Sequence, residues 1–259
     1  MAPLSRVSHF FSPSFPALIS VDFDGQAIAY LAFVVVLLPI VAVRTRLLIG
    51  GEAVEKPARD GEDASARGTT RSALLSRSVV LQIALFGTSL FVARNHGIVL
   101  WPSARVRASD VIAGGVAFTV LSLIGVLSWR IRSPEERRHM WVRHLIPRTP
   151  AQWGLWLAAS AAAGVSEETT YRGVLVVLLG SATASFAVGA LLSASVFALV
   201  HYPQGTKSVA LVFAIALVLQ AVVSVTGALY VAMVVHALYD MVAGVRAARR
   251  FADVDPVAA

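Results

Sequence analysis

The stretch Gln26–Val43 reads QAIAYLAFVVVLLPIVAV and carries no charged side chain. A helix needs roughly 20 predominantly apolar residues to cross a bilayer, so this run is of membrane-spanning length. It is also longer than the apolar part of a usual signal peptide, and it stops at Arg44 and Arg46. We therefore expect a retained membrane helix that follows an N-terminal segment, residues 1–25.

Apolar runs of similar length recur along the whole chain. Hydrophobic residues make up 57% of the sequence, charged residues only 14%, and the mean hydropathy is +0.72, which excludes an ordinary soluble domain with polar helix surfaces. The sequence therefore predicts an all-α fold, a polytopic membrane helix bundle of about seven transmembrane helices. After the first, the expected spans are residues 74–93, 110–129, 151–180, 183–201, 207–224 and 227–245.

Polar segments connect these spans. Residues 50–72 contain glycine and charges of both signs, a composition that cannot bury enough apolar surface to fold, so we expect a flexible linker there. Residues 130–150 are basic and form either an amphipathic segment on anionic lipid or a solvated loop. A tail, residues 246–259, is expected to follow the last span.

The distribution of basic residues predicts how the chain crosses the membrane. Loops on the cytoplasmic side of a membrane carry the excess of Lys and Arg. Of the 22 basic residues, only Arg6, Arg94, Arg105 and Arg107 fall on the side opposite to the linker and the basic loop. We therefore expect a cytoplasmic C-terminus and an N-terminus outside. The net positive charge is then explained by the membrane topology, and no nucleic-acid partner is expected.

One basic residue, Arg172, lies inside an apolar run, within the stretch Ser166–Gly173, SEETTYRG. A charge in a membrane is costly unless it is paired. Glu168 and Arg172 are four residues apart and would form an ion pair on one helix face, whereas Glu167 points about 100° away and has no partner on its own helix. Such a cluster can simply hold helices together, but a free carboxylate within the membrane also fits a functional site.

Two histidines in later spans each belong to an i, i+4 pair. Phe197 precedes His201 by one helical turn, and His236 precedes Asp240 by the same spacing. Either pair alone is weak evidence, since a histidine at a helix end is often a hydrogen-bonded interhelix residue. Together with Glu167 they place one carboxylate and two imidazoles on different membrane helices, which favours a catalytic site.

Taken in order, the motifs EExxxR, FxxxH and HxxxD on successive spans resemble those of the CAAX protease and bacteriocin-processing (CPBP, or Abi) family of intramembrane proteases. The resemblance covers residues 151–245 and implies that the last four spans form the catalytic four-helix core, with three accessory helices in residues 26–129. It implies an intramembrane endopeptidase similar to the CAAX prenyl proteases. Glu168 and Arg172 match the supporting ion pair of the family.

The resemblance also implies roles for the remaining motif residues. Glu167 matches the glutamate that activates water, His201 matches its histidine partner, and His236 with Asp240 match the pair that stabilises the oxyanion. The last position is more often asparagine in this family, and an aspartate can donate to an oxyanion only when it is protonated. We therefore expect Asp240 to orient His236.

Other functions remain open from the sequence. Glu167, His201 and His236 could bind zinc in a metallo-endopeptidase, because two histidines and a carboxylate with water form a known catalytic zinc set. No HExxH helix is present and Arg172 would oppose a dication, so no cofactor is favoured. The non-enzymatic alternatives are a membrane scaffold that binds a partner and a proton-coupled transporter, although a transporter more often shows inverted repeats.

The composition also bears on chemistry and location. The chain has no cysteine, which excludes disulfide bridges, thiolate metal ligands and a cysteine nucleophile. The bias toward alanine, valine and arginine indicates a bacterial plasma membrane. The expected partners are membrane lipid and a membrane-associated peptide or protein substrate.

Overall fold

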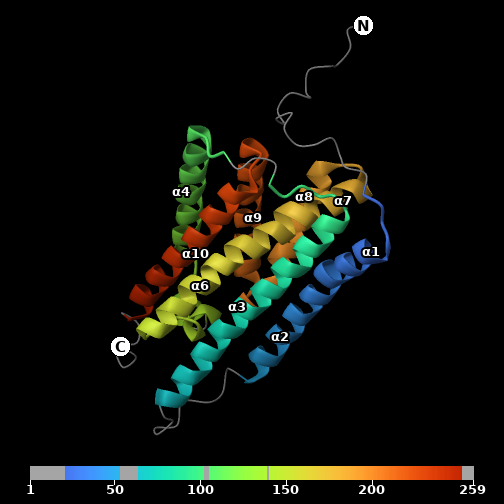
Figure 1. Ribbon diagram of the computed structural model, residues 1–259. Coiled ribbons are helices and arrows are strands. Elements are labelled where there is room, and N and C mark those ends of the chain that lie inside the picture. Colours follow the sequence, from blue (N-terminus) through green and yellow to red (C-terminus); the bar gives the residue numbers. More distant parts are fainter. Residues whose placement is uncertain (1–20, 53–63, 102–104, 139, 253–259) are drawn as a thin grey trace.

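The computed structural model describes residues 21–52, 64–101, 105–138 and 140–252, and this part of the chain is helical, with no strand (Figure 1). Two of its segments are π-helical, η1 and η3, and two short ones are 3-10 helices, η2 and η4. The elements are α1 (Gly25–Leu31), η1 (Ala32–Leu37), α2 (Leu38–Glu52), α3 (Ala64–Asn95), α4 (Ala108–Arg130), α5 (Pro134–Arg138), η2 (Trp141–His144), α6 (Pro150–Glu167), η3 (Glu168–Leu175), α7 (Val176–Thr183), α8 (Phe186–Val200), η4 (Tyr202–Gln204), α9 (Thr206–Thr226) and α10 (Leu229–Ala252).

The predicted polytopic helix bundle is confirmed. Within the described residues, five helices are long and apolar enough to cross a membrane: Gly25–Leu47, Arg71–Asn95, Ala108–Arg130, Thr206–Thr226 and Leu229–Phe251. The other two expected spans are also helical. One is the continuous run α6–η3–α7, which carries the charged motif, and the other is α8, an apolar helix shorter than a usual span.

The helices extend beyond the expected spans at three ends. Within the segment expected to be a linker, 50–72, α2 extends to Glu52 and α3 begins at Ala64, and residues 53–63 lie outside the described part. In the segment expected to be the tail, 246–259, α10 continues to Ala252. All three extensions add residues to a helix that the apolar span has already nucleated, which costs far less than starting a new helix.

In Figure 1, α6 (Pro150–Glu167) runs diagonally across the front of the bundle, and its residues Leu157 and Val165 are exposed. It packs between α3 and α10, while α4 packs against both α9 and α10. The helix α8 packs against α7 and α9, and α2 packs against α8. The charged motif at the end of α6 is therefore surrounded by helices from both halves of the chain.

The close approach of α6 and α10 depends on Gly164. A Cβ atom at this position would lie 2.6 Å from the carbonyl oxygen of Met233 and 2.9 Å from the Cβ of Ala237. Only glycine permits such contact between two membrane helices, which pack through small residues. Because Gly164 lies one turn before Glu168, and Ala237 adjoins His236, this contact sets the spacing of the site.

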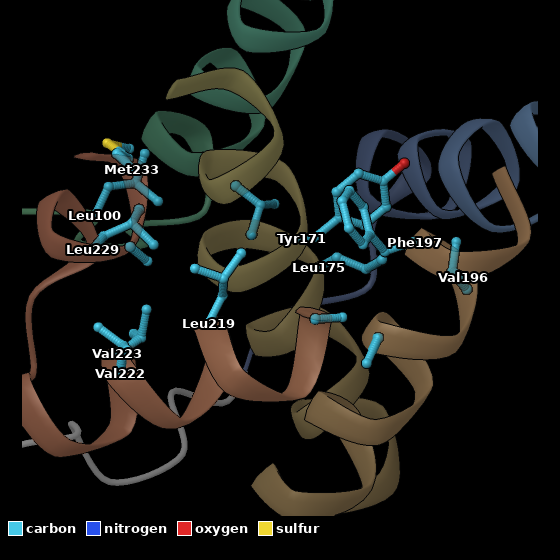
Figure 2. Close-up of a cluster of buried hydrophobic side chains, with 14 of the residues drawn as sticks. Leu100, Tyr171, Leu175, Val196, Phe197, Leu219, Val222, Val223, Leu229 and Met233 are labelled. Atoms are coloured by element: carbon cyan, nitrogen blue, oxygen red, sulfur yellow. The ribbon is translucent and has the colours of Figure 1, made fainter. Parts of the chain in front are cut away.

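The bundle buries a core and turns other apolar side chains outward. Figure 2 shows side chains of η3, α8, α9 and α10 meeting in this core, where Leu175, Phe197 and Leu219 are buried. Large apolar residues of the spans, among them Leu81, Ile112 and Val225, are exposed instead. Water would not tolerate that surface, whereas lipid tails would, which supports an integral membrane protein.

Candidate active site

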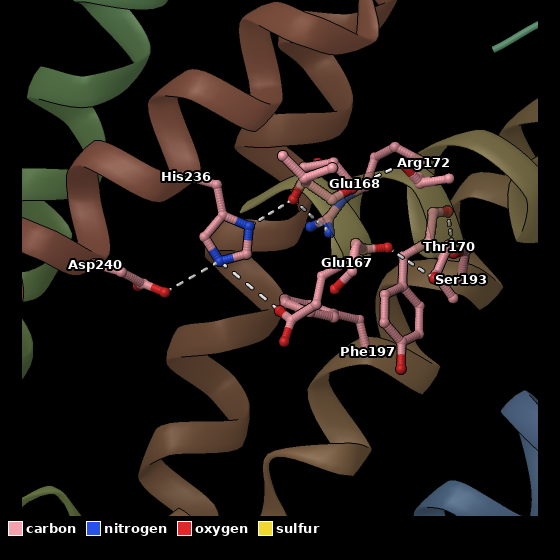
Figure 3. Close-up of polar contacts among 12 residues, drawn as sticks. Glu167, Glu168, Thr170, Arg172, Ser193, Phe197, His236 and Asp240 are labelled. Atoms are coloured by element: carbon pink, nitrogen blue, oxygen red, sulfur yellow. Dashed lines mark hydrogen bonds and ion pairs between the residues drawn. The ribbon is translucent and has the colours of Figure 1, made fainter. Parts of the chain in front are cut away.

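The charged motif lies at a change of helix type. Glu167 is the last residue of α6, and Glu168 begins the π-helix η3, in which every residue is buried. π-Helical turns occur mostly as single insertions in α-helices and are frequent at functional sites. Within η3, Nη1 of Arg172 lies 3.0 Å from Oε1 of Glu168, so the ion pair expected from their spacing is present (Figure 3).

The ring of His236 is surrounded by carboxylates (Figure 3). Its Nδ1 lies 2.7 Å from Oε1 of Glu168. Its Nε2 lies 3.5 Å from Oδ2 of Asp240 and 3.8 Å from Oε2 of Glu167. An ionised carboxylate can only accept a hydrogen bond, so the Nδ1 that faces the Arg172-paired Glu168 carries the hydrogen. The ring is thereby fixed with Nε2 turned toward Glu167.

Two carboxylates contact His236 at opposite edges of its ring. Glu168 of η3 makes the short contact with Nδ1, whereas Asp240, which we expected to orient the ring, lies at the Nε2 edge. The side chain of Asp240 is 34% exposed, whereas that of Glu168 is fully buried. The aspartate therefore lies on the open side of the histidine.

His201 lies just past the end of α8 and is held by its own helix. Its Nδ1 lies 2.8 Å from the carbonyl oxygen of Phe197, to which it donates, since a carbonyl can only accept. In the neutral ring this leaves Nε2 as an acceptor. The ring of Phe197 lies 4.7 Å from that of His201 and 6.2 Å from that of His236, and the guanidinium of Arg172 lies over it at 4.5 Å.

A cavity of about 320 Å³ lies beside the motif residues. The side chains of Glu167, His201, His236 and Asp240 all line it. Farther along α10 and at the end of α4 its lining becomes basic, with Arg132, Arg246 and Arg250. Arg250 lies ten residues beyond Asp240, or about 15 Å along the helix, so the cavity runs from the carboxylates toward the arginine-rich helix ends.

A family model described as type II CAAX prenyl endopeptidase Rce1-like matches residues 149–242. We call residues 149–242, which are similar to this family, the Rce1-like domain. The match confirms the resemblance seen over residues 151–245 and supports an intramembrane endopeptidase. No curated protein and no solved structure matches the chain.

One contact of the site comes from outside the Rce1-like domain and was missed from the sequence. Nε2 of Gln82, on α3, lies 2.6 Å from Oε1 of Glu167. Glu167 therefore lacks a partner only on its own helix. The available signal was an amide in the middle of an apolar span, between Leu81 and Ile83, since a polar side chain there needs an interhelical partner.

A catalytic zinc ion would need its protein ligands grouped around one point. Glu167, His201 and His236 line the same cavity, but in the described residues no group of three or more histidine or acidic side chains is arranged to hold a metal ion. Of these side chains, Glu167 and His236 approach each other with 3.8 Å between Oε2 and Nε2. The side chains as arranged do not fit a bound metal, so we derive no step through one.

Proposed function

We propose that the Rce1-like domain hydrolyses a peptide bond of a membrane-associated substrate with a water molecule activated by Glu167. The observation that carries this proposal is the shared cavity, which is lined by one carboxylate and two imidazoles from different helices. Peptide hydrolysis needs a base for water, donors for the tetrahedral oxyanion and exclusion of bulk solvent. The cavity within the helix bundle can supply all of these.

Glu167 is the base in this proposal because it lines the cavity and its Oε2 lies 3.8 Å from Nε2 of His236. The water oxygen attacks the carbonyl carbon of the scissile bond while Glu167 takes a proton from the water. The carbon–nitrogen bond then breaks, and the protonated Glu167 returns that proton to the leaving nitrogen. The oxygen and one hydrogen of the water end in the carboxylic acid, and its other hydrogen ends in the amine.

The two histidines have different roles in the proposed reaction. His201 has its Nδ1 bound to the backbone of α8, so its Nε2 is free to accept a hydrogen bond from the attacking water. His236 is held at Nδ1 by Glu168, and its Nε2 can donate to the oxyanion when it carries a hydrogen. Asp240, at 3.5 Å from that nitrogen, is placed to accept from it between turnovers.

We further propose that the substrate enters from the cytoplasmic side. The arginine-rich end of the cavity lies at the ends of α4 and α10, which the distribution of basic residues assigns to the cytoplasm. The C-terminus then lies in the cytoplasm and the N-terminus outside, as expected for a bacterial plasma-membrane protein. A membrane-anchored tail could reach Glu167 along the cavity without leaving the bilayer surface.

The direct test is cleavage by the purified protein in lipid vesicles. Peptides that end in a CAAX sequence, with and without a prenyl group, would be incubated in ¹⁸O-labelled water and the products analysed by mass spectrometry. The proposal predicts an internal cut with one ¹⁸O in the new carboxylate. Binding of these peptides without any cleavage would instead favour a scaffold.

A further inference from the structure

We infer that Gln82 of α3 is a positioning residue for the base Glu167, so that a helix outside the Rce1-like domain completes the active site. This inference rests on the proposed function. Its starting point is the 2.6 Å contact between Nε2 of Gln82 and Oε1 of Glu167. The two residues are 85 positions apart, and α3 packs directly against α6.

A second contact fixes which way the Gln82 amide points. The hydroxyl of Ser166 donates to Oε1 of Gln82, so the amide oxygen is occupied and the NH₂ group faces Glu167. The flipped amide would bring its oxygen against a carboxylate oxygen, and both are acceptors. Ser166 thus acts on Glu167 through Gln82, although the serine and the glutamate are neighbours in the chain.

The contact also distinguishes the two oxygens of Glu167. Oε1 accepts the hydrogen bond from Gln82, and Oε2 is the oxygen that lies 3.8 Å from Nε2 of His236. A carboxylate held at one oxygen by a donor cannot rotate freely, so its other oxygen keeps a fixed direction. The geometry therefore assigns Oε2 as the atom that takes the proton from water.

A chain of buried hydroxyl groups also connects these helices. Its members include Thr170, one turn after Glu167, and Ser89, two turns after Gln82. The Thr170 hydroxyl donates to the carbonyl of Ser166 at 2.8 Å, so the 2.7 Å contact from Ser89 must be donated by Ser89. Ser89 then accepts from Tyr30 at 2.9 Å. This chain anchors the start of η3 to α1 and α3, which holds Gln82 in register with Glu167.

The test compares Gln82→Met with Gln220→Met in the vesicle cleavage assay. Gln220 is the matched control because it too is a glutamine within an apolar span, and its Nε2 has no hydrogen-bond partner among the described residues. We expect Gln82→Met to lower kcat about 10- to 100-fold with KM near the wild-type value, because a misdirected base slows only the chemical step. Gln220→Met should keep the wild-type kcat.

A double-mutant cycle with Ser166→Ala makes the test specific to positioning. Ser166→Ala alone should lower kcat by a smaller factor, and in the Gln82→Met background it should lower kcat no further, because its effect passes through Gln82. Additive effects of the two substitutions would overturn this inference but not the proposed function. A wild-type kcat for Gln82→Met, in a protein whose activity still requires Glu167, would do the same. Wild-type activity of Glu167→Gln would overturn the proposed function as well.

Discussion

Nδ1 of His236 lies 2.7 Å from Oε1 of Glu168, the same carboxylate oxygen that lies 3.0 Å from Arg172. One oxygen of a fully buried side chain thus joins α10 to η3 and also pairs with the cation one turn away. Oε1 of Glu168 makes both contacts, and its buried Oε2 has no hydrogen-bond partner among the described residues. Of the two neighbouring glutamates, Glu167 is the one that lines the cavity.

This shared oxygen predicts the effect of removing the cation. Arg172→Gln leaves Glu168 buried without its counter-charge, so we expect a loss of folding stability of about 3 to 5 kcal/mol and a lower folded yield. The measurement is thermal unfolding of the purified protein in detergent. The double variant Glu168→Gln with Arg172→Gln should regain part of the loss, and a cycle without coupling would rule out the pair as a stabilising unit.

The contact at Gly164 predicts that separating α6 from α10 impairs the site. Gly164→Leu adds a side chain where even a Cβ would lie 2.6 Å from a backbone oxygen, so we expect a loss of about 1 to 3 kcal/mol in stability and a marked fall in cleavage rate. Gly154→Leu is the matched control, because Gly154 lies on the same helix with nothing within 4 Å of its Cβ position. Equal behaviour of the two variants would show that the close approach does not matter.

The proposed orientation can be tested by labelling single cysteines, since the natural chain contains none. We expect Gly61→Cys and Ala258→Cys to be protected from a membrane-impermeant reagent in intact cells, and Val106→Cys, between α3 and α4, to be labelled. All three should react after the cells are permeabilised. Labelling of both Gly61→Cys and Ala258→Cys in intact cells would contradict the seven-span topology.

The zinc alternative makes a different prediction from the metal-free mechanism. We expect stringent chelation to leave cleavage unchanged and elemental analysis to find less than one zinc per chain, because Glu167 acts without a metal. A zinc enzyme would lose activity on chelation, regain it when zinc is added, and lose bound metal in His201→Ala and His236→Ala. Metal content is measured on the purified protein, so it does not depend on the choice of substrate.

The sequence predicts the parts of this site that depend on spacing within one helix. The apolar runs indicated the spans, and the i, i+4 rule indicated the Glu168–Arg172 pair and the contact between Phe197 and His201. The roles of Glu167, His201 and His236 in catalysis stay predictions. No spacing rule connects them, because they meet only through the packing of separate helices.

Contacts between helices are what the sequence did not predict. The sequence placed Asp240 beside His236, but it did not predict that Glu168 of η3 contacts Nδ1 of the same ring. Gln82 was missed for a similar reason. Its effect on Glu167 depends on how α3 packs against α6, and no local pattern in either segment encodes that contact.

The central claim, that Glu167 is the base, is tested most directly by the cleavage rate of Glu167→Gln. Glutamine keeps the size of the side chain but cannot take a proton from water. We predict a fall in kcat on the order of 10²- to 10⁴-fold, with folded yield and thermal stability near those of the wild type. Full activity of the Glu167→Gln protein would contradict both the metal-free and the zinc mechanism, and the buried charges would then serve only to hold the helices together.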